Sequence, residues 1–117
     1  LRLAEDGSIL EIGQRPESLE EIEGQYMGLM KFTGKGLEQL KAVYHRTLQE
    51  GMLGPRPVEK AYMTDLLQAL IDDGVRVEAV QVRGPWVEMD TVEDLLMQTT
   101  LNRIDAIDVG TKRKAGY

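Results

Sequence analysis

The chain has 117 residues, which suits one domain. Its 29% charged and 42% hydrophobic residues are close to the averages of globular proteins, which argues against a chain that is disordered over its whole length. It has no cysteine and a single histidine, which excludes disulfide scaffolds, thiolate metal sites, cysteine catalysis and multi-histidine metal sites within the chain. The net charge of −6 argues against nucleic-acid binding, and no apolar run is long enough for a membrane helix, so we expect a cytoplasmic protein without nucleic-acid or membrane partners.

The first third of the chain predicts short strands. Asp6-Gly7 lies between two apolar runs and favours a hairpin turn, because both residues tolerate positive φ, so residues 1–13 are expected to form two strands. Residues 25–33 are nearly all apolar, which is typical of a short buried strand. Gly28 within it indicates a bulge; the alternative is a ligand-facing wall in which this glycine allows close approach of a substrate.

Apolar residues at spacings of three and four predict two helices in the middle of the chain, over 35–50 and 62–73. Gly51 follows the first helix and is a typical C-terminal stop. Thr64 can cap the start of the second helix. Residues 52–60 contain prolines and a glycine, which predicts an irregular connection between the helices.

The last third predicts two more strands and a helix. Residues 75–82 are rich in valine and partly alternating, and residues 86–90 alternate again, so both are expected to be strands. Residues 91–94 read Thr-Val-Glu-Asp, a capping box that opens a helix running to about Arg103.

The order of these elements predicts an α/β fold with a partly parallel sheet, formed as a single domain over residues 1–108. Residues 109–117 are rich in glycine and lysine, and we expect them to form a flexible tail. The sequence has no glycine-rich loop of the kind that cradles a nucleotide's phosphates.

An acidic pair near the third helix is the candidate metal site. In a strand over 86–90, residues two apart share a face, so Trp86, Glu88 and Asp90 would line one side. Two carboxylates at this spacing suit one hard cation, and Mg²⁺ takes one or two protein carboxylates together with water and substrate phosphate. The alternative is structural: Glu88 is then a solvated side chain, and Asp90 helps to cap the next helix.

Three stretches in this order resemble one known family: residues 23–32 (EGQYMGLMKF), 62–71 (YMTDLLQALI) and 86–95 (WVEMDTVEDL). They are similar to the C-terminal half of nucleotidyltransferases, of the sugar-phosphate nucleotidyltransferase and phosphocholine or phosphonate cytidylyltransferase type. With the leading hairpin, the resemblance covers about residues 1–102.

The resemblance implies a Rossmann-like α/β/α sandwich. It also implies Mg²⁺-dependent transfer of a nucleotidyl group from a nucleoside triphosphate to a phosphorylated small molecule, with release of pyrophosphate. Glu88 and Asp90 match the acidic motif of this family and are implied as metal ligands. The implied substrate-binding residues match the acceptor-facing strand, a position near the acceptor pocket, and the acidic motif itself: Tyr26, Gly28, Asp65 and Trp86.

The N-terminal half of this family, with its nucleotide loop and first metal-binding aspartate, has no counterpart in the sequence. We therefore expect the acceptor- and metal-binding portion of a nucleotidyltransferase, inactive alone, whose nucleoside triphosphate and phosphorylated acceptor bind when the other half is supplied. A half-sheet would expose an apolar edge that association normally covers, which predicts a homo-oligomer. The alternative function is a non-catalytic α/β module for interaction or assembly.

Overall fold

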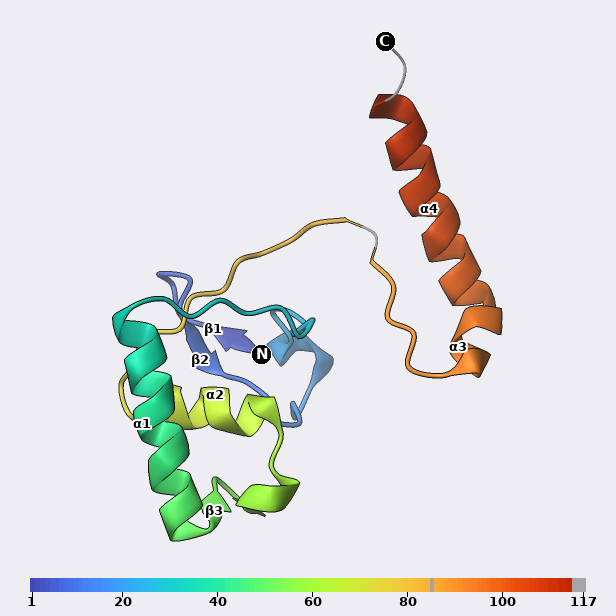
Figure 1. Ribbon diagram of the computed structural model, residues 1–117. Helices are drawn as coiled ribbons and strands as arrows, with labels where there is room; N and C mark the ends of the chain where they lie inside the picture. The colour runs from blue at the N-terminus through green and yellow to red at the C-terminus, as the bar shows by residue number, and fades with distance from the viewer. Residues whose placement is uncertain (85, 115–117) are drawn as a thin grey trace. The chain divides into compact units, whose positions relative to one another are not determined.

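The computed structural model of the chain describes residues 1–84 and 86–114. It contains two compact units, Leu1–Gln81 and Val82–Tyr117, which are described separately below. Figure 1 labels most of the helices and strands of both units.

The first unit opens with the expected hairpin. β1 (Arg2–Leu3) pairs antiparallel with β2 (Ile9–Glu11), and Gly7 between them has a φ of 81°. A 3₁₀ turn, η1 (Leu19–Glu21), lies in the polar loop that follows. The prediction of a hairpin around Asp6-Gly7 is confirmed.

Two helices carry most of the core of this unit. α1 (Lys35–Glu50) ends at Gly51, which adopts the left-handed conformation as expected. α2 (Met63–Asp72) begins after Tyr62, its N-cap residue, so the cap predicted at Thr64 is wrong. Between the helices lie a second antiparallel pair, β3 (Met52–Leu53) with β4 (Arg56–Pro57), and the 3₁₀ turn η2 (Val58–Lys60). The turn at Gly54-Pro55 therefore makes a small hairpin where the sequence predicted an irregular connection.

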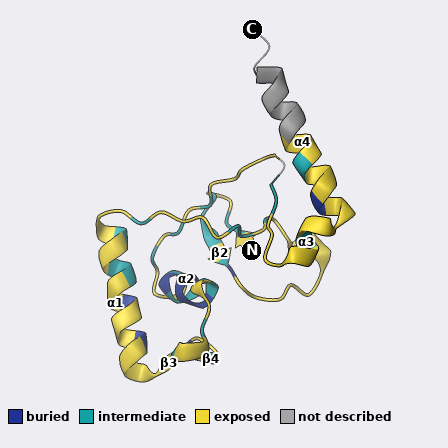
Figure 2. Cartoon of the chain, turned by 45° about the vertical axis from the view of Figure 1, so that its right-hand side comes forward, coloured by how far each residue is buried: buried dark blue, intermediate teal, exposed yellow. Residues whose placement is uncertain are grey.

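The core is small and lies where β2, the β3–β4 hairpin and the two helices meet. Figure 2 shows its buried residues on one side of α1 and along α2. Leu70 is the most deeply buried of them, with 1% of its surface exposed. The six buried apolar residues are Ile12, Val43, Leu53, Leu66, Leu67 and Leu70.

The second unit contains two helices, α3 (Val92–Leu96) and α4 (Gln98–Lys114). Thr91 and Asp94 form the predicted capping box. Met97 has extended backbone angles and separates the helices, so the single helix predicted to end near Arg103 is two helices. α4 covers residues 109–114 of the predicted tail, and residues 115–117 lie outside the described part.

Two of the three other predicted strands are wrong, because residues 25–33 and 86–90 are irregular. Residues 75–82 are only partly paired, through an isolated antiparallel bridge between Ser8 and Glu78. A strand exists only where a neighbour accepts and donates backbone hydrogen bonds, and local apolar patterns cannot supply that neighbour. Gly28 has a φ of 78°, which interrupts an extended path through the first of these segments.

The class is mixed α/β, as expected, but both strand pairings among the described residues are antiparallel. The partly parallel sheet is therefore not found in this part of the chain, and the Rossmann-like sandwich stays a prediction. The single domain over residues 1–108 also stays a prediction. None of the helices in the described residues combines the length and apolar character that crossing a membrane requires.

Candidate functional site

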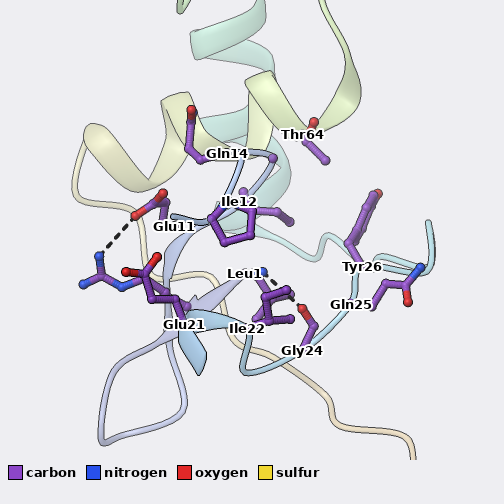
Figure 3. Close-up of a pocket in the computed structure, with 13 residues that line it drawn as sticks. Leu1, Glu11, Ile12, Gln14, Glu21, Ile22, Gly24, Gln25, Tyr26 and Thr64 are labelled. Carbon is purple, nitrogen blue, oxygen red and sulfur yellow. Dashed lines mark hydrogen bonds and ion pairs between the residues drawn. The ribbon is translucent and has the colours of Figure 1, made fainter. Parts of the chain in front are cut away.

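A cavity of about 300 Å³ lies in the first unit, beside the β1–β2 hairpin and the start of α2 (Figure 3). This volume is at the lower end of the range for small-molecule pockets. Its lining combines apolar, amide, hydroxyl and charged groups: Leu1, Arg2, Glu11, Ile12, Gly13, Gln14, Pro16, Glu21, Ile22, Gly24, Gln25, Tyr26 and Thr64.

The end of β2 fixes one wall of this cavity against α2. The backbone N–H of Ile12 donates to Oε1 of Gln68 at 2.8 Å, and Ile12 itself is buried. Gly13 has a φ of 77°, and a Cβ atom there would lie 2.8 Å from both Cβ and Oγ1 of Thr64. Only glycine combines this conformation with so close an approach to the helix, so Gly13 is required for the shape of the wall.

Tyr26 is half-buried and lines the cavity, and Figure 3 shows it next to Gln25. Burial raises the pKa of its phenol. A phenol is neutral near pH 7 even at its ordinary pKa of about 10, so this hydroxyl is available as a hydrogen-bond donor. Its hydroxyl lies 3.8 Å from the sulfur of Met30. Gly28, predicted to face the same ligand, is exposed and is not part of the cavity wall.

The charged side chains that line the cavity have partners within the protein. Nη1 of Arg2 lies 3.3 Å from Oε2 of Glu11, and Oε2 of Glu21 accepts a hydrogen bond from the backbone N–H of Glu17. The arrangement can hold a small polar molecule through amide, hydroxyl and apolar contacts.

Gly13 and Gln14 line the cavity but were not predicted as site residues from the sequence, although a glycine directly after an apolar strand is a signal of close backbone approach.

Asp65, predicted to lie near an acceptor pocket, is buried with a side-chain exposure of 6%. Its Oδ1 accepts from Nη1 of Arg56 at 2.7 Å, and its Oδ2 accepts from the backbone N–H of Tyr62 at 2.8 Å. The Arg56 guanidinium also lies 4.9 Å from the centre of the Tyr62 ring. Both carboxylate oxygens therefore hold the start of α2 and the β4 end of the hairpin together.

The predicted metal ligands belong to the second unit. Glu88 and Asp90 are both exposed, in an irregular segment directly before α3. The backbone N–H of Asp90 donates to Oδ2 of Asp94 at 3.0 Å, so this residue also takes part in the helix cap. Hydrogen bonds from Thr91 and Asp90 hold the pKa of Asp94 below its ordinary value.

Exposed carboxylates are the oxygen donors that Mg²⁺ prefers, so the chemistry of this pair fits the metal, although no strand aligns the two side chains. The described residues contain no cluster of three or more histidine, aspartate or glutamate side chains that could hold a metal ion. Trp86 is half-buried, and the Arg103 guanidinium lies 5.8 Å from its ring centre. The roles of Trp86, Glu88 and Asp90 stay predictions.

Comparison with known proteins supports a relationship to nucleotidyltransferases of the cytidylyltransferase type. The chain is 37% identical over 93 residues to a CTP:phosphoglutamine cytidylyltransferase of Campylobacter jejuni. The matched residues make up 80% of this chain and 37% of that protein, so the chain spans well under half of its length. No family model matches the chain, and no solved structure matches it.

Proposed function

We propose that this chain forms the acceptor- and metal-binding portion of a Mg²⁺-dependent nucleotidyltransferase. The reaction joins a phosphate oxygen of a phosphorylated small molecule to the α-phosphorus of a nucleoside triphosphate, and the bond to pyrophosphate breaks. The observation that carries this proposal is the 37% identity to a cytidylyltransferase over 93 residues. CTP and phosphoglutamine, the substrates in that protein's name, are accordingly the first to test.

The residues divide this work between binding and positioning. Glu88 and Asp90 would hold the metal, which neutralises negative charge on the phosphates when bound. The cavity beside Tyr26 would receive the organic part of the acceptor, through the phenol and the neighbouring amide groups. Asp65 would act as a positioning residue, because both of its oxygens are occupied within the protein.

The test replaces the matching segment of the Campylobacter enzyme with this chain and measures pyrophosphate release from CTP, Mg²⁺ and phosphoglutamine. We expect the chimera to be active and the 117-residue chain alone to be inactive.

Within the chimera, Asp90→Asn should lower kcat/KM by at least about 100-fold, because a metal ion supplies several kcal/mol of charge stabilisation.

Glu93→Gln is the matched control, since Glu93 is an exposed carboxylate in the first turn of α3, outside the Glu88–Asp90 pair. It should leave kcat/KM within about threefold, as is usual for an exposed surface change. A folded chimera without transfer activity would contradict the proposed function. Full activity of Asp90→Asn in an active chimera would contradict only the metal assignment.

A further inference from the structure

Residues 75–81 form an extended segment that lies beside β2. The N–H of Ile9 donates to the carbonyl of Val77 at 2.8 Å, and the N–H of Ala79 donates to the carbonyl of Gly7 at 3.2 Å. Val77 and Ala79 are half-buried, whereas Arg76, Glu78 and Val80 are exposed, so burial alternates as in a strand. The segment thus continues the β1–β2 hairpin as a third, incompletely paired strand.

One edge of this segment is open. Because Val77 and Ala79 direct their backbone groups toward Ile9 and Gly7 of the β1–β2 hairpin, the N–H and C=O groups of Arg76 and Glu78 point the other way. Within the described residues these groups make no hydrogen bond. Val80 at the same edge is 88% exposed. An unpaired edge rich in β-branched residues is a template for another strand.

We propose that a second copy of this chain pairs along this edge, antiparallel, about a two-fold axis through Val77. In this register Arg76 of each copy lies opposite Glu78 of the other, and both positions present their free N–H and C=O groups to the partner. The two-fold axis relates the two Arg76–Glu78 pairs between the copies, so one pair cannot form without the other. The result is one sheet in which each copy contributes β1, β2 and residues 75–81.

Charge favours this register over its neighbour. A two-fold axis through Glu78 would also satisfy the backbone groups, but it would place the two Glu78 side chains opposite each other. Like charges directly opposite on neighbouring strands are destabilising, and opposite charges are stabilising. The Arg-Val-Glu order of residues 76–78 is therefore self-complementary, which favours a second copy over an unrelated strand.

The ion pairs within one copy leave the edge accessible. Arg76 pairs with Asp6 at the hairpin turn and with Glu78, whose Oε1 lies 3.0 Å from its Nε. These side chains lie on the exposed face of the segment, whereas the proposed hydrogen bonds lie in the plane of the sheet. The partner's Glu78 carboxylate would add a third carboxylate to a guanidinium that Asp6 and Glu78 of its own copy already hold.

Single-cysteine variants of the full chain test the axis, because the natural sequence has no cysteine. Val77→Cys should form a disulfide-linked dimer under mild oxidation, since opposite residues of a non-hydrogen-bonded pair are about 4.5 Å apart at Cα, within disulfide reach. Ala79→Cys is the matched control: it lies on the same face, but the two copies of residue 79 would be roughly 13 Å apart. Preferential linkage through residue 79, or equal linkage at both positions, overturns the proposal.

Charge exchange tests the same register without a new covalent bond. Light scattering should show a dimer for the natural chain. Arg76→Glu should weaken dimerisation about tenfold or more, and the double variant Arg76→Glu/Glu78→Arg should restore it. Asp6→Asn, which removes the carboxylate charge that pairs with Arg76 at the turn, should leave the dimer intact. A strictly monomeric natural chain, or one that pairs only with an unrelated strand, overturns the proposal.

Discussion

At the residue scale, Asp6 ties two distant parts of the first unit together. Its Oδ1 accepts hydrogen bonds from the backbone N–H of Ser8 at 3.0 Å and from the Ser8 hydroxyl at 2.6 Å, and its Oδ2 pairs with Arg76. These bonds, those from Ser8 first, hold the pKa of Asp6 well below its ordinary value of 3.8. The charged carboxylate is therefore part of the folded hairpin.

This shift predicts a loss of stability in acid. Because the folded pKa lies below the unfolded one, the stabilisation is complete above about pH 4 and is lost as the pH falls toward the lower value. Asp6→Asn should therefore reduce the fall in urea midpoint between about pH 6 and about pH 3. Glu5→Gln is the control, because no ion pair or hydrogen bond of the neighbouring Glu5 side chain is found in the described residues. An equal acid response of Asp6→Asn and the natural chain would contradict the prediction.

Asp6 also shows what the sequence could and could not predict. The Asp6-Gly7 pair predicts the turn because its signal is local. The bond from Arg76 could not be predicted, since it joins residues 70 positions apart. The same limit applies to Tyr26, whose place in the cavity wall depends on a loop packing beside α2.

At the element scale, Asp65 joins the β3–β4 hairpin to the start of α2. The carboxylate caps the helix through the N–H of Tyr62 and pairs with Arg56, which is 40% exposed at its side chain. Asp65→Ala should lower the free energy of unfolding by about 2 kcal/mol, which combines the loss of a cap with that of a partly solvated ion pair. Chemical denaturation measures this loss, and Glu59→Gln on the exposed surface should change it by less than about 0.5 kcal/mol.

A destabilisation of Asp65→Ala no larger than that of Glu59→Gln would show that the two bonds add little. If Asp65→Ala nevertheless abolished activity in the chimera, that loss would point to the acceptor role implied by the family resemblance.

The predicted helices and strands differ in how far the sequence alone could predict them. Caps, stops and helical spacing are local, so α1, α2 and the capping box at Thr91 follow from the sequence. Strands depend on partners elsewhere in the chain, so residues 25–33 and 86–90 did not form them.

At the scale of the whole molecule, nearly all buried side chains among the residues with described burial, 1–84 and 86–107, lie in the first unit. Its six buried apolar residues come from β2, β3, α1 and α2, or directly follow them, whereas Thr100 is the one buried side chain described in the second unit. Leu70→Ala should cost about 2–5 kcal/mol, since it leaves a cavity in this small core. Amide hydrogen exchange should then show lost protection in β2, α1 and α2, with exchange in α3 and α4 unchanged.

Leu19→Ala provides the matched control, because the same substitution is made at a leucine that is 84% exposed. It should alter protection in neither unit, since truncation of an exposed side chain leaves no cavity. Parallel loss of protection in α3 and α4 of Leu70→Ala would contradict independent unfolding of the units. That outcome would instead support one cooperative domain over residues 1–108, because a cavity in one core can unfold a second region only if the two share their stability.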